Sequence, residues 1–176
     1  GATVIGMDLI YPTSVDRPGL MPGHDKPFLK ALYRAGRAGR LVLGELQVSA
    51  QPLRPHPGQV MAVGGDGNLA QLNLLVDRDD VVRGYPAHFE AIGGGVRPSL
   101  AVEVARRAGA KVPPGDFLID FTDMRAAIDT FSFADIYACA MAGRADFLGA
   151  AFKDRIVLIG TALDIEDRRL AANRYM

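Results

Sequence analysis

Polar side chains and one glycine stand at the ends of three apolar segments of this sequence. They are Asp8, Asp120, Thr122, Gly160 and Thr161. If the strands before them run parallel, these residues meet at one edge of a sheet, where hydrogen bonds can hold a small ligand. We predict a ligand-binding site there, with Arg125 as its basic member. For Asp8 a structural role is an equal alternative, because a strand-end carboxylate also caps a helix or pairs with an arginine.

The residue patterns of catalysis, metal binding and cofactor binding are missing. The three histidines are isolated from one another: His24, His56 and His88. The chain has neither the Gly-x-Ser-x-Gly elbow of hydrolases nor, after its first strand, the Gly-x-Gly-x-x-Gly fingerprint of dinucleotide folds. The acidic group at 164–167 is more typical of a solvated loop than of a cation site. We therefore predict no catalytic residue, no metal site and no cofactor.

Length and composition favour one domain. The chain has 176 residues, of which 49% are hydrophobic and 23% charged, enough for a single α/β core. Twenty basic residues balance twenty acidic ones, so nucleic acid is not an expected partner. The single cysteine, Cys139, excludes an internal disulfide and is predicted to be a small core residue. No run approaches the roughly 20 apolar residues that span a bilayer.

Hydrophobic runs in both halves of the chain predict strands. Four aliphatic residues at 156–159 precede a glycine and predict a strand buried on both faces, which we place at the centre of the sheet. A second strand is predicted beside it at 4–10. Residues 26–35 predict an amphipathic helix that Gly36 ends, and 41–48 predict the next strand. These segments form a β-α-β unit.

The middle of the chain predicts antiparallel structure. Two extended runs, 69–76 and 81–89, flank an acidic turn and predict a half-exposed antiparallel hairpin. A helix follows Ser99, and a further buried strand is predicted at 117–121. The predicted fold class is therefore α/β: a single domain at 1–176 with a mixed, mostly parallel sheet flanked by helices, and an antiparallel hairpin.

The clearest predicted helix occupies 132–142. Ser132 and Asp135 have the spacing of a capping box, in which each side chain satisfies a backbone N–H of the first turn. The residues predicted to face inward are Phe133, Ile136, Tyr137, Ala140 and Met141.

Five segments occur in the order and spacing of a known family. They are Gly6-Met7-Asp8-Leu9-Ile10, the predicted hairpin from Asn73 to Arg83, Leu118-Ile119-Asp120-Phe121, Phe131-Ser132-Phe133-Ala134-Asp135, and Phe152 to Gly160. In these segments the chain resembles the second type of CHASE domain, a family of extracellular sensory domains associated with cyclases and histidine kinases. The resemblance covers nearly the whole chain.

The resemblance implies a role in signalling. It implies an extracytoplasmic sensor, periplasmic or extracellular, within a plasma-membrane receptor of a bacterium. The parent protein would be anchored by flanking membrane helices and would control a cytoplasmic adenylate or guanylate cyclase, histidine kinase or serine/threonine kinase. The domain itself would catalyse nothing, its ligand would be an unknown small molecule, and a homodimer is possible. The family often has asparagine and tyrosine before a glycine where this chain has Asp120, Phe121 and Thr122, so its ligand need not be shared.

Two other functions remain open at this point. One is a small soluble α/β enzyme that acts at the carboxyl ends of its strands. The other is a dimerisation module without a ligand. Because the sequence opens almost directly on a strand, we expect a domain excised from a larger protein.

Overall fold

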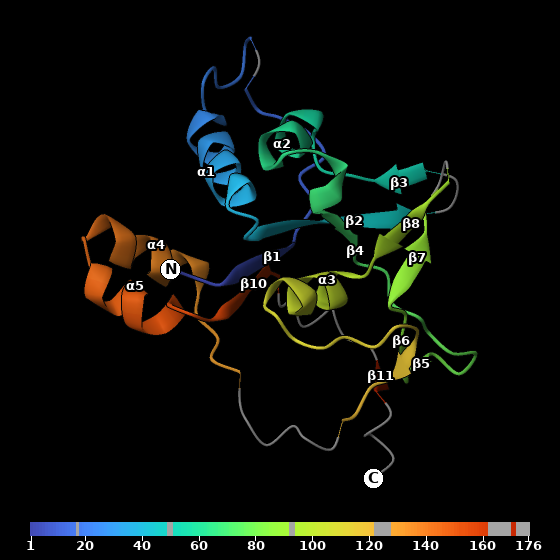
Figure 1. Cartoon of the computed structure of the whole chain (residues 1–176). Coiled ribbons are helices and arrows are strands. Elements are labelled where there is room, and N and C mark those ends of the chain that lie inside the picture. Colours follow the sequence, from blue (N-terminus) through green and yellow to red (C-terminus); the bar gives the residue numbers. More distant parts are fainter. Residues whose placement is uncertain (17, 49–50, 92–93, 122–127, 162–169, 172–176) are drawn as a thin grey trace.

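The computed structural model describes residues 1–16, 18–48, 51–91, 94–121, 128–161 and 170–171 (Figure 1). The helices in this part of the chain are α1 (Lys26–Arg37), α2 (Pro57–Val63), α3 (Leu100–Arg107), α4 (Phe133–Met141) and α5 (Ala145–Phe152), with a 3-10 turn η1 (Asp66–Asn68). The strands are β1 (Val4–Asp8), β2 (Leu41–Val48), β3 (Gln51–Leu53), β4 (Leu69–Gln71), β5 (Val81–Val82), β6 (Gly84–Tyr85), β7 (His88–Glu90), β8 (Val96–Pro98), β9 (Phe117–Leu118), β10 (Ile156–Gly160) and β11 (Leu170–Ala171).

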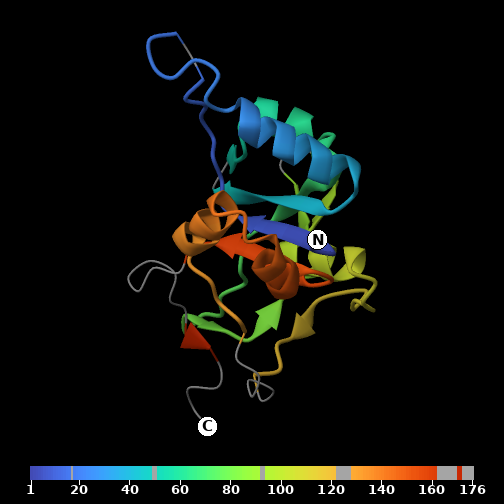
Figure 2. The ribbon, with the colours of Figure 1, turned by 90° about the vertical axis from the view of Figure 1, so that its left-hand side faces the viewer.

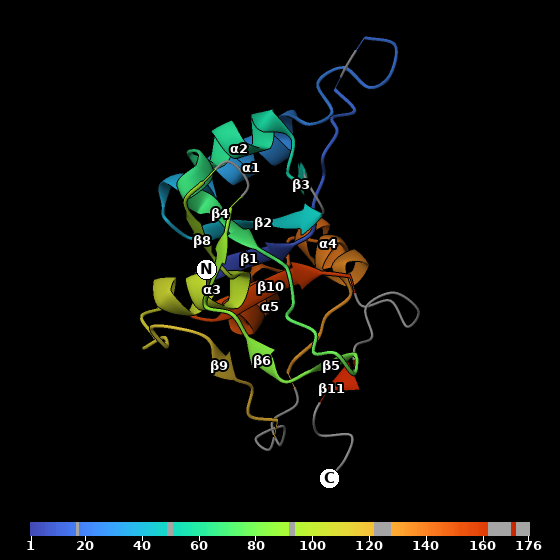
Figure 3. The same ribbon diagram turned by 90° about the vertical axis from the view of Figure 1, so that its right-hand side faces the viewer.

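The central sheet is mostly parallel. Its strands follow the order β10-β1-β2-β4, and β3 adds antiparallel to the end of β2. Figure 3 shows β2, β1 and β10 stacked in this order. Helix α1 connects β1 to β2, as the β-α-β prediction requires. The structure therefore confirms the predicted fold class, a mixed α/β sheet with flanking helices and antiparallel hairpins.

Strand β10 does not lie at the predicted centre of the sheet. Among the described residues, β1 and β2 have strand neighbours on both sides, whereas β10 pairs only with β1. Ile156 and Leu158 are 49% and 64% exposed, because α3 packs mainly against β1, β2 and β4. The aliphatic run thus predicted the strand correctly but not its burial or its place in the sheet.

The alternation of side chains divides the core into two layers. One layer joins α1 and α2 to the sheet through Met7, Leu32, Leu41, Leu43, Val63 and Leu69. The other joins α3 to the opposite face through Val4, Val42, Ala70, Leu100 and Val104. Successive residues of β1 and β2 point to opposite faces, so both faces of these two strands are covered.

The hairpin predicted for 69–76 and 81–89 is not formed. Residues 69–71 are β4, which is fully buried and runs parallel to β2. Beyond the acidic turn, β5 pairs with β11 and β6 pairs with β9. The turn itself is present, since the Asp77 N–H donates to the Val81 carbonyl at 3.0 Å. Among the described residues, the consecutive strands that pair antiparallel are β2 with β3 and β7 with β8, because strand partners depend on packing beyond the local pattern.

The segment at 117–121 is a short surface strand and not the predicted buried one. β9 pairs antiparallel with β6, and Leu118 is 80% exposed. The Ile119 N–H extends this pairing by donating to the Arg83 carbonyl at 2.9 Å. Asp120 therefore does not end a parallel strand of the central sheet, which was the premise for grouping it with Asp8.

The helix predicted at 132–142 is present as α4, but its predicted inward face is wrong. Ser132 makes no side-chain capping hydrogen bond. Three residues predicted to point inward are largely exposed: Phe133 at 73%, Tyr137 at 60% and Met141 at 71%. Cys139, predicted to be a core residue, is only half-buried. The reason is that α4 packs chiefly against α5 and not against the sheet.

A buried ion pair ties α3 to the rest of the fold. Glu103, whose side chain is 6% exposed, lies 2.6 Å from Arg107 Nε. Arg107 Nη1 also donates to the Leu41 carbonyl at 3.0 Å and to Asn68 Oδ1 at 2.8 Å. Burial raises the pKa of Glu103, but hydrogen bonds from Arg106 and Arg107 outweigh this effect and hold the pKa below its ordinary value. The pair therefore stabilises the fold at neutral pH, and this contribution is lost as the pH falls through that lowered pKa.

Candidate ligand-binding site

Asp8 and Gly160 lie side by side at the carboxyl ends of β1 and β10. They are register partners in the parallel pair, and Thr161 follows directly. A Cβ built on Gly160 would lie 3.3 Å from the Asp8 Cβ, so the glycine leaves room for the Asp8 side chain. The structure thus brings three of the predicted site residues to one edge of the sheet.

Tyr85 lies within electrostatic reach of this edge and was missed by the sequence prediction. Its pKa is raised, first by burial and also by the negative charge of Asp8. Hydrogen bonds with Ser99 and with the Ala101 backbone, at the first turn of α3, act in the opposite direction. A protonated phenol therefore stands near the Asp8 carboxylate at neutral pH.

The other predicted site residues, Asp120, Thr122 and Arg125, do not follow β1 or β10. Asp120 follows β9, which belongs to a separate two-stranded ladder with β6. Thr122 and Arg125 lie outside the described residues. Asp8, Asp120 and Thr161 each interact with other groups of the protein. Their role in ligand binding stays a prediction.

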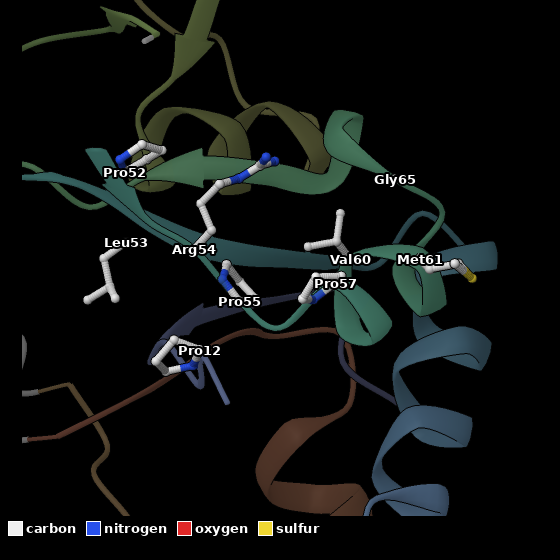
Figure 4. A pocket seen from close by; sticks show the side chains of 9 residues that line it. All are labelled: Pro12, Pro52, Leu53, Arg54, Pro55, Pro57, Val60, Met61 and Gly65. Carbon is white, nitrogen blue, oxygen red and sulfur yellow. The ribbon is translucent and has the colours of Figure 1, made fainter. Parts of the chain in front are cut away.

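An open cleft of about 510 Å³ lies between the loop after β1 and the connection from β3 to α2. We call it the proline cleft; its lining residues are Pro12, Pro52, Leu53, Arg54, Pro55, Pro57, Val60, Met61 and Gly65 (Figure 4). A smaller and more polar hollow of about 340 Å³ shares Pro12 with it. The volume of the proline cleft is within the range of small-molecule sites, roughly 300–1,000 Å³.

Hydrogen bonds join the two walls of the proline cleft. The His56 N–H donates to the Tyr11 carbonyl at 2.9 Å, and Gln59 Nε2 donates to the same oxygen at 3.3 Å. Pro57 occupies the first turn of α2, where a backbone N–H would have no helical partner. His56 Nδ1 caps this turn by accepting from the Gly58 N–H at 3.1 Å. Because four lining residues are prolines without an N–H, the walls offer few donors and suit apolar surface.

A buried polar cluster, which we call the Glu45 network, adjoins the proline cleft. Glu45 is 3% exposed. It accepts hydrogen bonds from Arg54 Nε and Gln71 Nε2, both at 3.0 Å, and lies 3.2 Å from Arg97 Nε. Asp66 completes the network, 2.7 Å from Nη2 of Arg54 and of Arg97. Two carboxylates therefore balance two guanidinium groups.

The Glu45 network neutralises the charge that the cleft would otherwise present. Burial raises the pKa of Asp66, but hydrogen bonds from Arg54 and Arg97 outweigh it, so the pKa is lowered and the carboxylate is ionised at neutral pH. Figure 4 shows the Arg54 side chain turned away from Pro12, with its stem beside the cleft. Arg54 is the charged residue of the lining, and its charge is already paired.

The described residues contain neither a metal-binding cluster nor a helix suited to cross a membrane. No group of three or more histidine, cysteine, aspartate or glutamate side chains converges there on a common point where a metal would bind. The acidic group at 164–167 lies outside these residues. Within the same part of the chain, no helix combines the length and the apolar character needed to cross a membrane.

Of the Glu45 network and the proline cleft, only the network has a signal in the sequence. Glu45 interrupts the apolar strand at 41–48, and a carboxylate buried in a strand requires a hydrogen-bonded cation. This predicts a buried partner for Glu45 but not its identity. The prolines at 52, 55 and 57 indicate only an irregular segment, so the proline cleft could not be expected from them.

The fold defines an α/β domain whose open clefts are built by loops next to the carboxyl end of β1. The family model of the CHASE2 domain matches residues 1–172. The chain therefore belongs to the CHASE2 family, whose members are sensory, non-catalytic domains of signalling receptors. This membership argues against the enzyme alternative. No curated protein and no solved structure matches the chain.

Proposed function

We propose that this domain is the extracytoplasmic sensor of a bacterial transmembrane receptor. It controls a cytoplasmic adenylate or guanylate cyclase, histidine kinase or serine/threonine kinase, and membrane helices of the parent protein flank it. The observation that supports this proposal is the CHASE2 match across residues 1–172. A sensor of this kind has two states with different affinity for a ligand, and binding shifts the population between them.

We place the ligand in the proline cleft, as a small molecule with a mostly apolar surface. The volume, the proline lining and the paired charge of Arg54 favour this class of ligand. Occupation of the cleft would press on the loop after β1, which Figures 1 and 2 show projecting beyond the helices. The competing site is the polar group predicted from the sequence: Asp8, Asp120, Thr122, Arg125, Gly160 and Thr161.

A charge in the proline cleft should impair sensing. Met61 lines the cleft and is 79% exposed, so Met61→Arg adds a charge without disturbing the core. In the full-length receptor we expect its signal-dependent output to fall roughly tenfold, the effect of losing about 1.4 kcal/mol of ligand affinity. Tyr33→Arg, at a 49% exposed residue of α1 outside the lining, is the control and should leave the output unchanged. If Asp8→Ala impaired the response and Met61→Arg did not, the ligand site would be the polar group at the strand ends and not the proline cleft.

The proposed location can be tested by labelling intact cells. We would introduce Met61→Cys into the full-length receptor together with Cys139→Ser, which removes the single native cysteine of this domain. A membrane-impermeant maleimide should label this receptor before the cells are permeabilised, because residue 61 is largely exposed. The receptor with Cys139→Ser alone reports labelling elsewhere in the parent protein. Labelling of residue 61 only after permeabilisation would contradict an extracytoplasmic location.

A dimerisation module without a ligand is the second candidate function. The observation that favours it is the exposed apolar surface of α4, where Phe133, Tyr137 and Met141 are each at least 60% exposed. If neither Met61→Arg nor Asp8→Ala alters the receptor's response, this function becomes the better account.

A further inference from the structure

Helix α4 exposes apolar side chains that a folded domain normally covers. Its nine residues include one charged side chain, Asp135, and none of the nine is buried. Figures 1 and 2 show α4 beside α5 at the β10 side of the domain. Exposed patches of this kind commonly mark a protein interface.

The exposed apolar residues of α4 form one continuous face. At 3.6 residues per turn, Phe133, Tyr137 and Met141 fall within about 80° of one another. We call this surface the α4 face: Phe133, Ala134, Tyr137, Ala138, Ala140 and Met141. Asp135 points to the opposite side of the helix by the same geometry, whereas Ile136 and Cys139, both half-buried, lie between these two sides and face away from the α4 face.

We infer that the α4 face binds the α4 face of a second copy of this chain, with the two helices antiparallel. Phe133 and Met141 are equally distant from Tyr137 along the helix, so a twofold axis near Tyr137 brings each Phe133 against the partner's Met141. An aromatic ring and a thioether make a favourable contact. A twofold interface requires such a self-complementary surface. The alanines between the large side chains let the two helix backbones approach closely.

The lack of charge on the α4 face suits a second copy of this neutral chain, and the exposed area sets the strength of the contact. The α4 face has no charged residue, so it offers nothing specific to an ionic partner, and the zero net charge of the chain gives two copies no long-range repulsion. Taking about 200 Å² for each whole large side chain, the three large residues expose on the order of 400 Å² per copy. This is below the roughly 800 Å² of a standard interface, so the free domain forms a weak dimer. This step rests on the proposed function: two receptors in one membrane would dimerise more strongly, because the membrane holds them close together.

The first test is the association of the 176-residue chain by sedimentation equilibrium, from about 10 μM to about 1 mM. A reversible monomer–dimer equilibrium is expected. Tyr137→Glu places two like charges near the twofold axis and should weaken the association of the two copies at least tenfold. Tyr33→Glu is the matched control: Tyr33 is 49% exposed on α1, and a glutamate there keeps an i,i+4 contact with Arg37. A chain that stays monomeric at 1 mM, or equal weakening by both variants, overturns the proposal and leaves the α4 face to another protein segment.

A second test fixes the orientation of the two helices. Phe133→Lys alone should weaken the dimer, because each lysine meets the partner's Met141. Adding Met141→Glu should restore at least part of the lost affinity, since each lysine then meets the partner's introduced glutamate. In a parallel pair the same double variant would place like charges together. A double variant that binds more weakly than Phe133→Lys overturns the antiparallel arrangement, and unchanged circular dichroism of each variant shows that the fold is intact.

Discussion

Replacing Glu45 by alanine is expected to lower the free energy of unfolding by about 3–5 kcal/mol. Glu45 is 3% exposed and joins Arg54, Gln71 and Arg97 in one network. Without it, Arg54 and Arg97 share the single carboxylate of Asp66, so one positive charge of the network is left unbalanced, and Gln71 Nε2 loses the acceptor of its hydrogen bond. Urea unfolding of the 176-residue chain at pH 7 measures the loss as a fall in midpoint at constant slope.

Two further variants separate the charge of Glu45 from its shape. Glu45→Gln keeps the size and one oxygen but removes the charge, so we expect a smaller loss of about 1–3 kcal/mol. Glu90→Ala removes an exposed glutamate from β7 and should change the stability by less than about 0.5 kcal/mol. If Glu45→Ala cost no more than Glu90→Ala, the Glu45 network would not be the coupled buried cluster described above.

The sequence predicts those elements of this fold whose signal is local. The strands at 4–10 and 41–48 and the helix that follows residue 25 were found because each hydrophobic pattern lies within one element. The strand at 156–160 was found for the same reason. The sequence pattern did not predict that this strand, β10, pairs only with β1 among the described strands. The number of neighbours of a strand depends on the rest of the chain.

Strand pairing was the main error, and its cause is physical. The turn at 77–80 is correctly predicted, but an extended segment beside a turn pairs with whichever strand gives it the best packing. Residues 69–71 gain more burial beside β2, where all three are fully buried, than they would in a surface hairpin. The β-propensity of the segment is the same in both arrangements.

The candidate site also has one part that the sequence predicts and one part that it does not. Asp8, Gly160 and Thr161 converge as predicted, because the carboxyl ends of adjacent parallel strands lie at one edge. The walls of the proline cleft are joined by hydrogen bonds from the segment at 56–59 to the carbonyl of Tyr11. These two parts of the chain are distant in sequence. No local pattern reports such a contact, so this cleft is visible only in the structure.

Replacing Gly36 by alanine is expected to destabilise the fold by about 1–3 kcal/mol, although alanine is the better helix former. The sequence pattern predicted that Gly36 ends the helix, but α1 continues to Arg37 and Gly36 is buried. A Cβ on Gly36 would lie 2.5 Å from the Val63 carbonyl oxygen and 2.7 Å from the Val63 Cα. Both atoms belong to the backbone of α2, so the two helices would have to move apart.

Gly149→Ala is the matched control for this contact. Gly149 also lies within a helix, α5, but an ideal Cβ there would meet no atom within 4 Å beyond its chain neighbours and the backbone of its own helix. We expect it to stabilise the chain by about 0.5–1 kcal/mol, because alanine loses less backbone entropy in a helix. Both substitutions gain helix propensity, so opposite signs in urea unfolding would isolate the contact between α1 and α2. Equal stabilisation by the two variants would mean that α1 and α2 do not approach each other closely at Gly36.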